Sequence, residues 1–488
     1  MCPQARRSND AFETFRNLDW PTIIIYLIMV FAGMVSIYAA SYDFDEASMF
    51  SYDEFSGKQL RWIGLSLMLG FVLLMVNARM YETYAYPIYI ALLVLLFITP
   101  FIAHDIKGSR SWISLGAMSL QPAEFAKFAT ALALAKLFSG YHFVLNASWK
   151  NYARALLIIF MPVVLILAQN ETGSALTFMA LFFVLYREGM SGLILFAAMF
   201  AVVIFVVGLK YANTMVGSVP AGEFAVLVMV VIVTVVMTVL YTKRLQPVRN
   251  LLIWYGGSAI ILGALAFFGV DLPLLPVMLG IIGVATVYLA VLAFTRSRLW
   301  IPVCTALLSI AFLFSVNIAF DKVLQPHQQM RIKVALGIVE DLRGTGYNVN
   351  QSKIAIGSGG FAGKGFLNGT QTKLKYVPEQ HTDFIFCTIG EEEGFVGSAI
   401  VTLLFVALIL RVISIAERQP GTFTRVYAYC VASYFIFHFC INIGMVIGLC
   451  PVIGIPLPFF SYGGSSLWGF TILLFVLLRL DAARKSSL

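Results

Sequence analysis

The stretch GFLNGTQTKLKYVPEQHTDFIF, residues 365–386, contains the boundary that decides the fold. The chain is polar up to Asp383, and from Phe384 to residue 410 it is predominantly apolar. An apolar run of this length can cross roughly 30 Å of hydrocarbon as a helix. The stretch therefore predicts a polar segment that ends at a membrane surface, with Asp383 at the point of entry.

Similar apolar runs recur along all 488 residues. Hydrophobic residues make up 60% of the chain and charged residues 12%, whereas a soluble protein has about 25% charged residues. This composition excludes an ordinary soluble domain, a disordered chain and a disulfide-stapled secreted module. We predict an all-α polytopic membrane protein with about 14 transmembrane helices. The predicted spans are 20–40, 61–77, 84–103, 122–138, 153–168, 174–187, 189–209, 224–241, 250–269, 274–294, 300–319, 384–410, 426–449 and 462–480.

The basic residues indicate the orientation of these spans. An even number of spans places both termini on one side of the membrane. If that side is the cytoplasm, 19 Lys and Arg lie in or beside the inside segments and 5 in the short outside loops, as the positive-inside rule requires. The net charge of +8 then reports topology more than binding to nucleic acid. We expect both termini in the cytoplasm and residues 320–382 outside.

The predicted organisation has four parts. A cytoplasmic tail (1–19) precedes a membrane domain (20–319), and an extracytoplasmic segment (320–383) leads into the C-terminal helices and tail (384–488). Because residues 320–383 form the only sizeable polar region, we expect function to concentrate there.

Asp383 has two interpretations. As a helix N-cap, its carboxylate would accept backbone N–H bonds and complement the positive end of the helix. As a carboxylate at the membrane surface beside His381 and Glu379, it could act as a general base on a lipid-linked substrate. The two roles can coexist, and His381 could equally be an ordinary surface residue.

A glycine-rich stretch, GSGGFAGKG at 357–365, lies in the same segment. Its backbone N–H groups and Lys364 could approach a phosphate closely, although a flexible outside loop has the same composition. The partial match to G-x-G-x-x-A lacks a βαβ context, so we exclude a dinucleotide site.

Ionisable residues in or beside the predicted spans are further candidates. Glu124 and Lys127 are three residues apart and share one face of an apolar helix; they indicate function or a neutralising structural pair. Glu171 lies between two spans on the outer side, where it could also be a solvated loop carboxylate. Residues 391–393, all Glu, lie either on one long tilted helix or on an interfacial helix that precedes a shorter span.

The stretch PVIGIPLPFFSYGGSS, 451–466, breaks the backbone at the outer surface. Irregular backbone near membrane depth is tolerated where it is buried in protein or lines a cavity. Together with the 104–121 loop and the long outside segment, this stretch predicts that polar groups converge on one side. We therefore expect the substrate to be reached from outside.

These segments closely resemble the SEDS family (shape, elongation, division and sporulation proteins). The most specific run is GTGYNVNQSKIAIGSGGFAGKGFLNGTQTKLKYVPEQHTDFIF, 344–386, and the resemblance is strong over 327–480. The family usually has ten spans. The resemblance therefore implies the SEDS fold, with a ten-helix core and about four extra helices within 190–317.

The resemblance implies an enzyme that polymerises lipid II into glycan strands during cell elongation, at the outer face of the bacterial cytoplasmic membrane. Asp383 matches the essential acidic residue of the family's H-T-D-F motif. Trp112, Glu124, Lys127 and Glu379 match other motif positions. The implied partner is a class B penicillin-binding protein, and neither an organic cofactor nor nucleic acid is expected.

The implied reaction is an inverting glycosyl transfer in which Asp383 accepts the proton of the acceptor hydroxyl. The leaving undecaprenyl pyrophosphate needs positive charge where negative charge develops. The candidates for that charge are a divalent cation (Mg²⁺ or Mn²⁺) and the basic residues Arg331, Lys333, Lys353 and Lys364.

The sequence departs from the family pattern at two notable positions. Glu171 replaces the Asp of the Q-P-D-L-G-T motif, and Ser111 replaces the Arg that commonly precedes the motif Trp. A lipid II flippase or other secondary transporter is the main alternative function, and a non-catalytic scaffold is a third. Intramembrane Glu124 and Lys127 fit transport, whereas the outside segment that ends in H-T-D fits catalysis.

Overall fold

The structure is a computed structural model that describes residues 15–42, 54–105, 108–115, 118–242, 244–270, 272–322, 324–339, 341, 344 and 346–484. Residues 1–14 of the predicted tail thus lie outside the described part. The chain divides into two compact units: unit 1 comprises Met1–Ser191 and Gly346–Leu488, and unit 2 comprises Gly192–Thr345. The segment 320–383 is shared between the units, and the predicted domain boundaries stay a prediction.

Unit 1 is a helical bundle with one short hairpin. The hairpin strands pair antiparallel, with Ile113 opposite Leu120. The helices and strands of unit 1 are α2 (Trp20–Ser41), α3 (Phe55–Met75), α4 (Ala78–Thr83), α5 (Ala85–Ile102), β1 (Ile113–Leu115), β2 (Met118–Leu120), α6 (Pro122–Phe138), η1 (Leu145–Ala147), α7 (Trp149–Leu167), α8 (Thr172–Thr177), η2 (Phe178–Ala180), α9 (Leu181–Arg187), α16 (Tyr347–Gly359), α17 (Thr370–Lys373), α18 (Ile385–Glu392), α19 (Gly394–Glu417), α20 (Thr422–Val446) and α21 (Gly464–Arg484).

The bundle is built around α20 and α21. Their most apolar stretches are 67% and 72% buried by protein, against 22% for α3 and for α5. α21 packs against α3, α6 and α20, and α20 packs against α6 and α19. Helices satisfy their own backbone hydrogen bonds, as lipid requires, so α3 and α5 can face lipid while α20 and α21 carry polar groups inside the protein.

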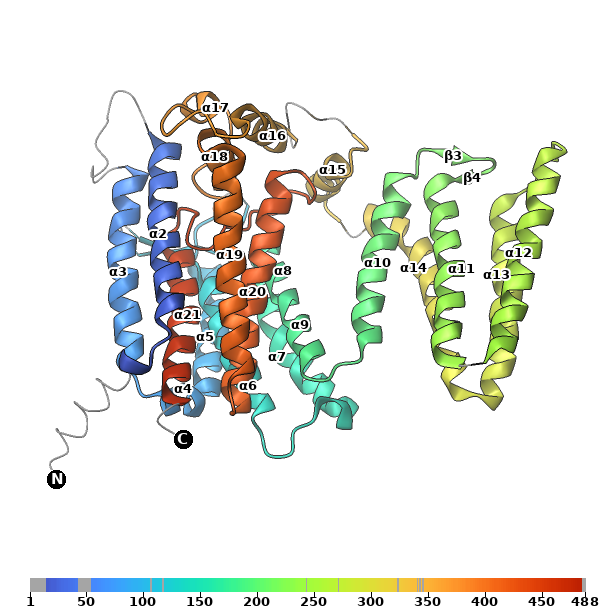
Figure 1. Ribbon diagram of the computed structural model, residues 1–488, viewed down its shortest axis with the longest axis horizontal. Coiled ribbons are helices and arrows are strands. Elements are labelled where there is room, and N and C mark those ends of the chain that lie inside the picture. Colours follow the sequence, from blue (N-terminus) through green and yellow to red (C-terminus); the bar gives the residue numbers. More distant parts are fainter. Residues whose placement is uncertain are drawn as a thin grey trace. The chain divides into compact units, whose positions relative to one another are not determined.

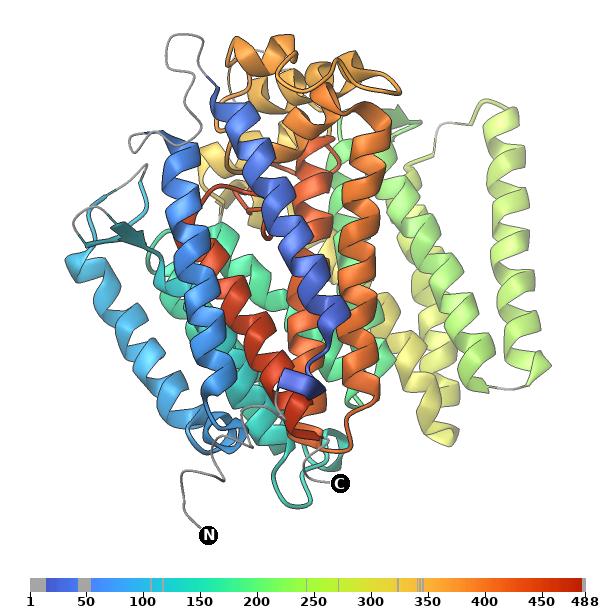
Figure 2. The ribbon, with the colours of Figure 1, turned by 60° about the vertical axis from the view of Figure 1, so that its left-hand side comes forward.

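The two ends of unit 1 differ in what they carry. The first described residues before α2 and the end of α21 lie at one end, and α16, α17 and α18 lie at the other (Figures 1 and 2). The segment around Asp383, which leads into α18, therefore lies opposite the end at which α2 begins and α21 ends.

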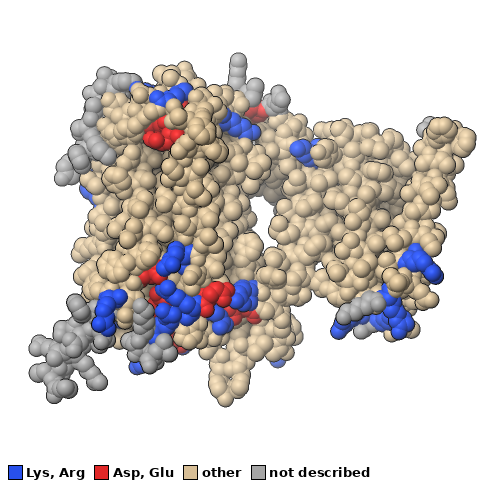
Figure 3. Space-filling model, viewed as in Figure 1, with Lys and Arg blue, Asp and Glu red and all other residues tan. Residues whose placement is uncertain are grey.

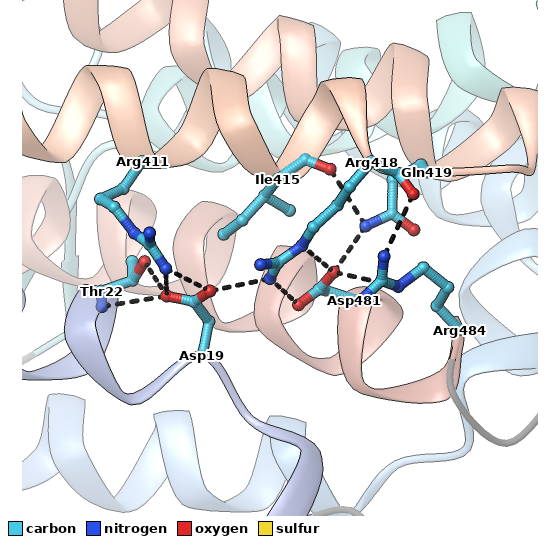
Figure 4. Close-up of polar contacts among 8 residues, drawn as sticks. All are labelled: Asp19, Thr22, Arg411, Ile415, Arg418, Gln419, Asp481 and Arg484. Carbon is cyan, nitrogen blue, oxygen red and sulfur yellow. Dashed lines mark hydrogen bonds and ion pairs between the residues drawn. The ribbon is translucent and has the colours of Figure 1, made fainter.

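A buried ionic cluster joins α2, α19 and α21 at the terminal end (Figure 4). Asp19, the N-cap of α2, pairs with Arg411 at 2.7 Å and with Arg418 at 2.8 Å. Arg418 also pairs with Asp481, which accepts a 2.6 Å hydrogen bond from Gln419 Nε2. Burial raises the pKa of Asp19, but hydrogen bonds, led by that from Arg411, outweigh burial and lower the pKa to about 2. Charge-assisted bonds therefore hold these three helix ends together.

Unit 2 has its own apolar core, in which Ile204, Leu227, Ile282 and Leu313 are buried. Its strands β3 and β4 form a two-residue hairpin ladder. The elements of unit 2 are α10 (Gly192–Lys210), β3 (Met215–Val216), β4 (Val219–Pro220), α11 (Ala221–Thr242), α12 (Leu245–Phe267), α13 (Leu274–Thr295), η3 (Ser297–Leu299), α14 (Trp300–Lys322) and α15 (Pro326–Ala335). The region predicted to hold about four extra helices, 190–317, lies almost wholly in this unit.

All 14 predicted runs coincide with helical segments of the described chain, which confirms an all-α polytopic membrane protein. Eleven helices among the described residues are long and apolar enough to span a membrane. The other three runs form α6 with 17 residues, the broken segment α8–η2–α9, and α14. A total of 14 crossings stays a prediction.

The run 384–410 is not one helix, as the predicted span assumed. It breaks at Glu393 into α18 and the candidate span α19, because Gly394 adopts φ +65°. A Cβ atom on Gly394 would lie 2.2 Å from the backbone nitrogen of Gly363, so only glycine fits this close approach. Of the two arrangements left open by the sequence, a short helix before a shorter span is therefore confirmed.

Candidate active site

Asp383 lies half-buried in a turn directly before α18. The N-cap of α18 is Phe384, one residue further on, so the interpretation of Asp383 as the N-cap residue is wrong. Gly454, with φ +80°, approaches closely: a Cβ atom on it would lie 3.4 Å from Asp383 Oδ2. The irregular segment 451–466 thus passes directly beside the Asp383 carboxylate, as the convergence of polar segments predicted.

Asn442 on α20 forms hydrogen bonds to both the turn that carries Asp383 and the 451–466 segment. Its side-chain Nδ2 donates 2.8 Å hydrogen bonds to the backbone oxygens of Asp383 and Ile455. The Asn442 side chain is fully buried. One amide group, with two N–H donors, therefore sets where Asp383 stands relative to the 451–466 segment.

We expect Asn442→Leu to lower the rate constant kcat for the reaction at this site roughly tenfold to a hundredfold, with little change in KM. The substitution keeps a similar shape but removes both donors, and displacement of a reacting group by about 1 Å can cost a hundredfold in rate. Steady-state kinetics on purified protein measure the split between kcat and KM. Cys440→Leu, at an exposed position on the same helix, should retain the wild-type kcat; a wild-type kcat in folded Asn442→Leu would rule out positioning by Asn442.

Glu124 and Lys127 form the ion pair that their spacing predicted. Lys127 Nζ lies 2.8 Å from Glu124 Oε1, and both side chains are almost completely buried. Lys127 Nζ also lies 3.1 Å from His438 Nε2, and His438 Nδ1 lies 3.1 Å from the backbone oxygen of Pro456. His438 is therefore the neutral tautomer that accepts from Lys127 and donates to Pro456. The pair extends through His438 to the 451–466 segment.

Sequence reasoning missed both His438 and Asn442. They are four residues apart on α20 and so lie on one face of that helix. Two polar residues at this spacing inside the apolar run 426–449 were the available signal, because intramembrane polar groups mark functional faces.

Glu171 joins two further segments at the same site. Its Oε2 accepts hydrogen bonds from Ser109 Oγ at 2.9 Å and from Ser111 Oγ at 3.1 Å. Gly173, two residues on, lies so close to the 451–466 segment that a Cβ atom on it would be 2.7 Å from the Ile453 oxygen. Ser111 and Glu171, two of the positions that depart from the family pattern, are thus linked by a hydrogen bond from the serine hydroxyl to the carboxylate.

Glu379 and His381 shape the turn before Asp383. Glu379 is exposed and has φ +55°, and its backbone oxygen accepts the N–H of Thr382 at 3.1 Å. The His381 ring stacks on Phe55 with centroids 4.1 Å apart, and its backbone oxygen accepts the N–H of Tyr462. His381 therefore anchors the turn to α3 and to the 451–466 segment and is more than a solvated surface residue.

Lys364 pairs with Glu391, which is fully buried on α18. Nζ of Lys364 lies 2.7 Å from Glu391 Oε1, and the Glu391 carboxylate also accepts the backbone N–H groups of Gln371 and Thr372. Burial raises the pKa of Glu391, but the bonds from Lys364 and its neighbours lower it to about 2. Glu391 therefore holds the 358–372 segment onto α18.

The glycine-rich stretch does not present a row of free N–H groups to a phosphate. The N–H groups of Gly363, Lys364 and Gly365 bond to the backbone oxygens of Gly359, Glu391 and Glu392 at 2.9–3.1 Å. Its first residues, up to Gly359, belong to α16. These N–H groups and Lys364 therefore bond within the protein, and the structure does not support the expectation that they bind a phosphate.

Glu392 is buried next to Glu391 on α18, and only one of its two carboxylate oxygens has a hydrogen-bond partner among the described residues. Its Oε2 accepts the N–H of Leu367 at 3.1 Å, while Oε1 has no hydrogen-bond partner among the described residues. Burial raises the pKa of Glu392 to about 7. In the folded protein the neutral form is thus favoured up to near-neutral pH.

Glu392→Gln is expected to make stability less dependent on pH. Because the folded pKa lies above the unfolded one, Glu392 lowers stability as pH rises from about 4.5 to 7 and above. The variant should exceed the wild type by on the order of 3 kcal/mol at pH 8 and match it below pH 4. Unfolding measured across pH 4–8 tests this, with exposed Glu393→Gln as the control; a pH-independent difference between Glu392→Gln and the wild type would contradict it.

The remaining predicted residues do not take part in the contacts of Glu391 and Glu392 described above. Trp112 is half-buried directly before β1, and Lys353 is exposed on α16 against Gly448. Arg331 lies exposed on α15 of unit 2, and Lys333 on the same helix stacks over Phe320. Among the described residues, no group of three or more His, Cys, Asp or Glu could hold a metal ion.

The fold and the site together define a polytopic helical membrane protein with a carboxylate site opposite the end at which α2 begins and α21 ends. The family model FtsW/RodA/SpoVE, described as cell cycle protein, matches residues 19–218 and 218–486. The chain belongs to this family, which confirms the resemblance seen in the sequence.

Named relatives and a solved structure agree with this assignment. The chain is 29% identical to the peptidoglycan glycosyltransferase RodA of Treponema pallidum over 96% of this chain and 98% of that protein. It is 29% identical to the peptidoglycan glycosyltransferase MrdB of Escherichia coli over 92% of this chain and 89% of that protein. A solved structure described as "Structural coordination of polymerization and crosslinking by a peptidoglycan synthase complex" has a TM-score of 0.60 and 25% identity, and covers 96% of this chain and 98% of that one.

Proposed function

We propose that this protein is a peptidoglycan glycosyltransferase that polymerises lipid II, with Asp383 as its general base. The observation that carries the proposal is the position of Asp383, which Asn442 fastens beside the 451–466 segment. Glu171 and its serine partners adjoin the same segment. The names of the relatives, peptidoglycan glycosyltransferases, support the class of reaction.

In the proposed reaction, the 4-hydroxyl of the acceptor GlcNAc attacks the anomeric carbon of MurNAc on the lipid-linked donor. The Asp383 carboxylate takes the hydroxyl proton as the new C–O bond forms, which requires a contact of about 3 Å. The bond from the anomeric carbon to the pyrophosphate oxygen breaks, and undecaprenyl pyrophosphate leaves. Attack from the face opposite the leaving group inverts the anomeric centre.

Positive charge must meet the leaving pyrophosphate. Of the basic candidates in unit 1, Lys364 is engaged by Glu391, whereas Lys353 is exposed beside Gly448, where the chain enters the 451–466 segment. We therefore assign Lys353 to this role in preference to Lys364. A divalent cation, Mg²⁺ or Mn²⁺, would supply the same charge, but the described residues offer no cluster of three or more His, Cys, Asp or Glu to hold it.

The proposal places the site outside the cytoplasmic membrane of a bacterium, with both termini inside. The charge distribution of the sequence supports this orientation, and so does the location of α18 opposite the end at which α2 begins and α21 ends. A class B penicillin-binding protein is the proposed partner, because the solved complex to which this chain is similar combines polymerisation with crosslinking.

Transport of lipid II is the second candidate, favoured by the buried Glu124–Lys127–His438 network. Intramembrane ionisable chains of this kind occur in proton-coupled transporters. Catalysis explains more of the observed contacts. Transport gives no role to the Asp383 carboxylate, which lies beside the 451–466 segment directly before α18.

One experiment separates these functions. Purified full-length protein, with and without the penicillin-binding protein, is given fluorescent lipid II in detergent and, in parallel, in vesicles. Glycan polymer supports the proposal. Movement of lipid II between leaflets without polymer would establish transport instead, and neither activity in the presence of the partner would favour a scaffold.

A further inference from the structure

One end of unit 2 carries arginines that have no acidic partner among the residues that the structure describes. They lie where α11 gives way to α12 and where α13 gives way to α14. We call this set the arginine cluster; its members are Arg244, Arg249, Arg296 and Arg298. None of the four makes an ion pair with a described residue, and all except Arg296 are exposed.

The two connections that carry the cluster are neighbours in space. The η3 turn packs against α11, α13 and α14. Leu299 of this turn and Leu251 of α12 belong to the same buried core. The four guanidinium groups therefore share one end of unit 2.

The described carboxylates of unit 2 lie far from the cluster. Glu223 is in the first turn of α11, and Asp341 follows α15, beyond the C-terminal end of α14. Because α11 has 22 residues, Glu223 is roughly 30 Å from the arginine end. Figure 3 shows basic side chains without acidic ones at this end of unit 2.

At the end of unit 1 where α2 begins and α21 ends, Figure 3 shows basic and acidic side chains intermixed. Arg16, Arg79, Lys150 and Arg154 are exposed there and make no ion pair with a described residue, whereas other basic side chains pair with carboxylates. The pairs are Arg411–Asp19, Arg418–Asp481, Arg425–Glu188, Arg187–Glu417 and Lys136–Glu82. The arginine cluster differs because the described carboxylates of unit 2 lie away from its end, so a counter-charge for the cluster has to come from outside the described residues of unit 2.

Exposed aromatic and aliphatic groups lie beside the arginines. Trp300 is 40% exposed and Phe294 81% exposed, and their rings pack edge to face at 5.6 Å. Leu245, adjacent to Arg244, is 87% exposed. Tryptophan next to basic residues at the end of an apolar helix is typical of the lipid headgroup level. An acidic soluble protein would not need these apolar neighbours, whereas a lipid offers both a phosphate and acyl chains.

We propose that the arginine cluster binds the phosphate groups of anionic phospholipids in the leaflet at that end of unit 2. Guanidinium groups bind phosphate oxygens with two parallel hydrogen bonds, and they are more weakly hydrated than ammonium groups. The phosphodiester would lie against the guanidinium groups, and the acyl chains would lie along the apolar faces of α12 and α13. This inference does not depend on the proposed enzymatic activity.

The test uses full-length protein in phosphatidylcholine vesicles that contain a trace of spin-labelled phosphatidylglycerol. The fraction of label immobilised by the protein is compared with that of spin-labelled phosphatidylcholine. We expect at least a tenfold preference for phosphatidylglycerol, which falls at 1 M salt. A variant with all four arginines replaced by Gln should lose most of the preference, and one with all four replaced by Lys should retain part of it.

The controls separate the cluster from general charge effects. Arg187→Gln with Arg425→Gln removes two paired arginines of unit 1 and should leave the preference intact. Inorganic phosphate at 10 mM should not displace the labelled lipid, because it lacks acyl chains. Equal immobilisation of both lipids by the wild type, an unchanged preference in the Gln variant, or an equal loss in the unit 1 control would each overturn the proposal.

Discussion

Asp383→Asn is expected to abolish glycan polymerisation while leaving the protein folded and able to bind lipid II. Asparagine keeps the shape of the side chain but cannot accept a proton, and general-base catalysis contributes typically 10²–10⁴-fold to a rate. The backbone oxygen of residue 383, which accepts the bond from Asn442, is unaffected by the change. We therefore expect kcat to fall by roughly a thousandfold, with KM for lipid II within about twofold of the wild-type value.

Polymerisation of lipid II by purified protein, read as glycan chains on gels, measures this effect. Asp105→Asn provides a matched control, because Asp105 is an exposed carboxylate of the loop that also carries Ser109 and Ser111. Glu379→Gln tests the rival base four residues before Asp383. Substantial polymer from Asp383→Asn, together with loss of polymer from Glu379→Gln, would transfer the general base to Glu379.

The spans could be predicted because lipid permits few backbone structures. A run such as 122–138 must satisfy its N–H and C=O groups internally, and it forms α6 with those same bounds. The break at Glu393 could not be decided in this way. It depends on the approach of Gly363 to Gly394, a contact between residues that a hydropathy pattern does not connect.

The site was predicted where its partners are close in sequence and missed where they are distant. Glu124 and Lys127 are three residues apart, so helix geometry alone predicted their contact. His438, which extends that pair, is 311 residues from Lys127. For Lys364 the sequence predicted a role that the structure does not support. Glycines around a lysine indicate a phosphate site, but Lys364 forms an ion pair with Glu391, 27 residues away. Composition identifies the residue types at a site, whereas distant partners decide what each residue does.

Lys127→Met is expected to cause the largest loss of stability of any single substitution considered for this protein. It leaves the Glu124 carboxylate, 3% exposed, without its cation and removes the donor to His438. Breaking a buried pair from one side costs about 3–5 kcal/mol, whereas replacing both members by neutral groups is often nearly neutral. The double variant Glu124→Gln with Lys127→Met should therefore recover most of the loss. Titration with sodium dodecyl sulfate measures both.

The same helix supplies the control for this prediction. Lys136 pairs with Glu82 at 3.0 Å, but both side chains are more than 30% exposed, so Lys136→Met should cost less than about 1 kcal/mol. A double variant no more stable than Lys127→Met alone would show that the loss does not come from an isolated buried charge. The double variant also bears on function. It restores the fold but not the link from Lys127 through His438 to Pro456, so a folded yet slow double variant would mean that this link positions the 451–466 segment beside Asp383.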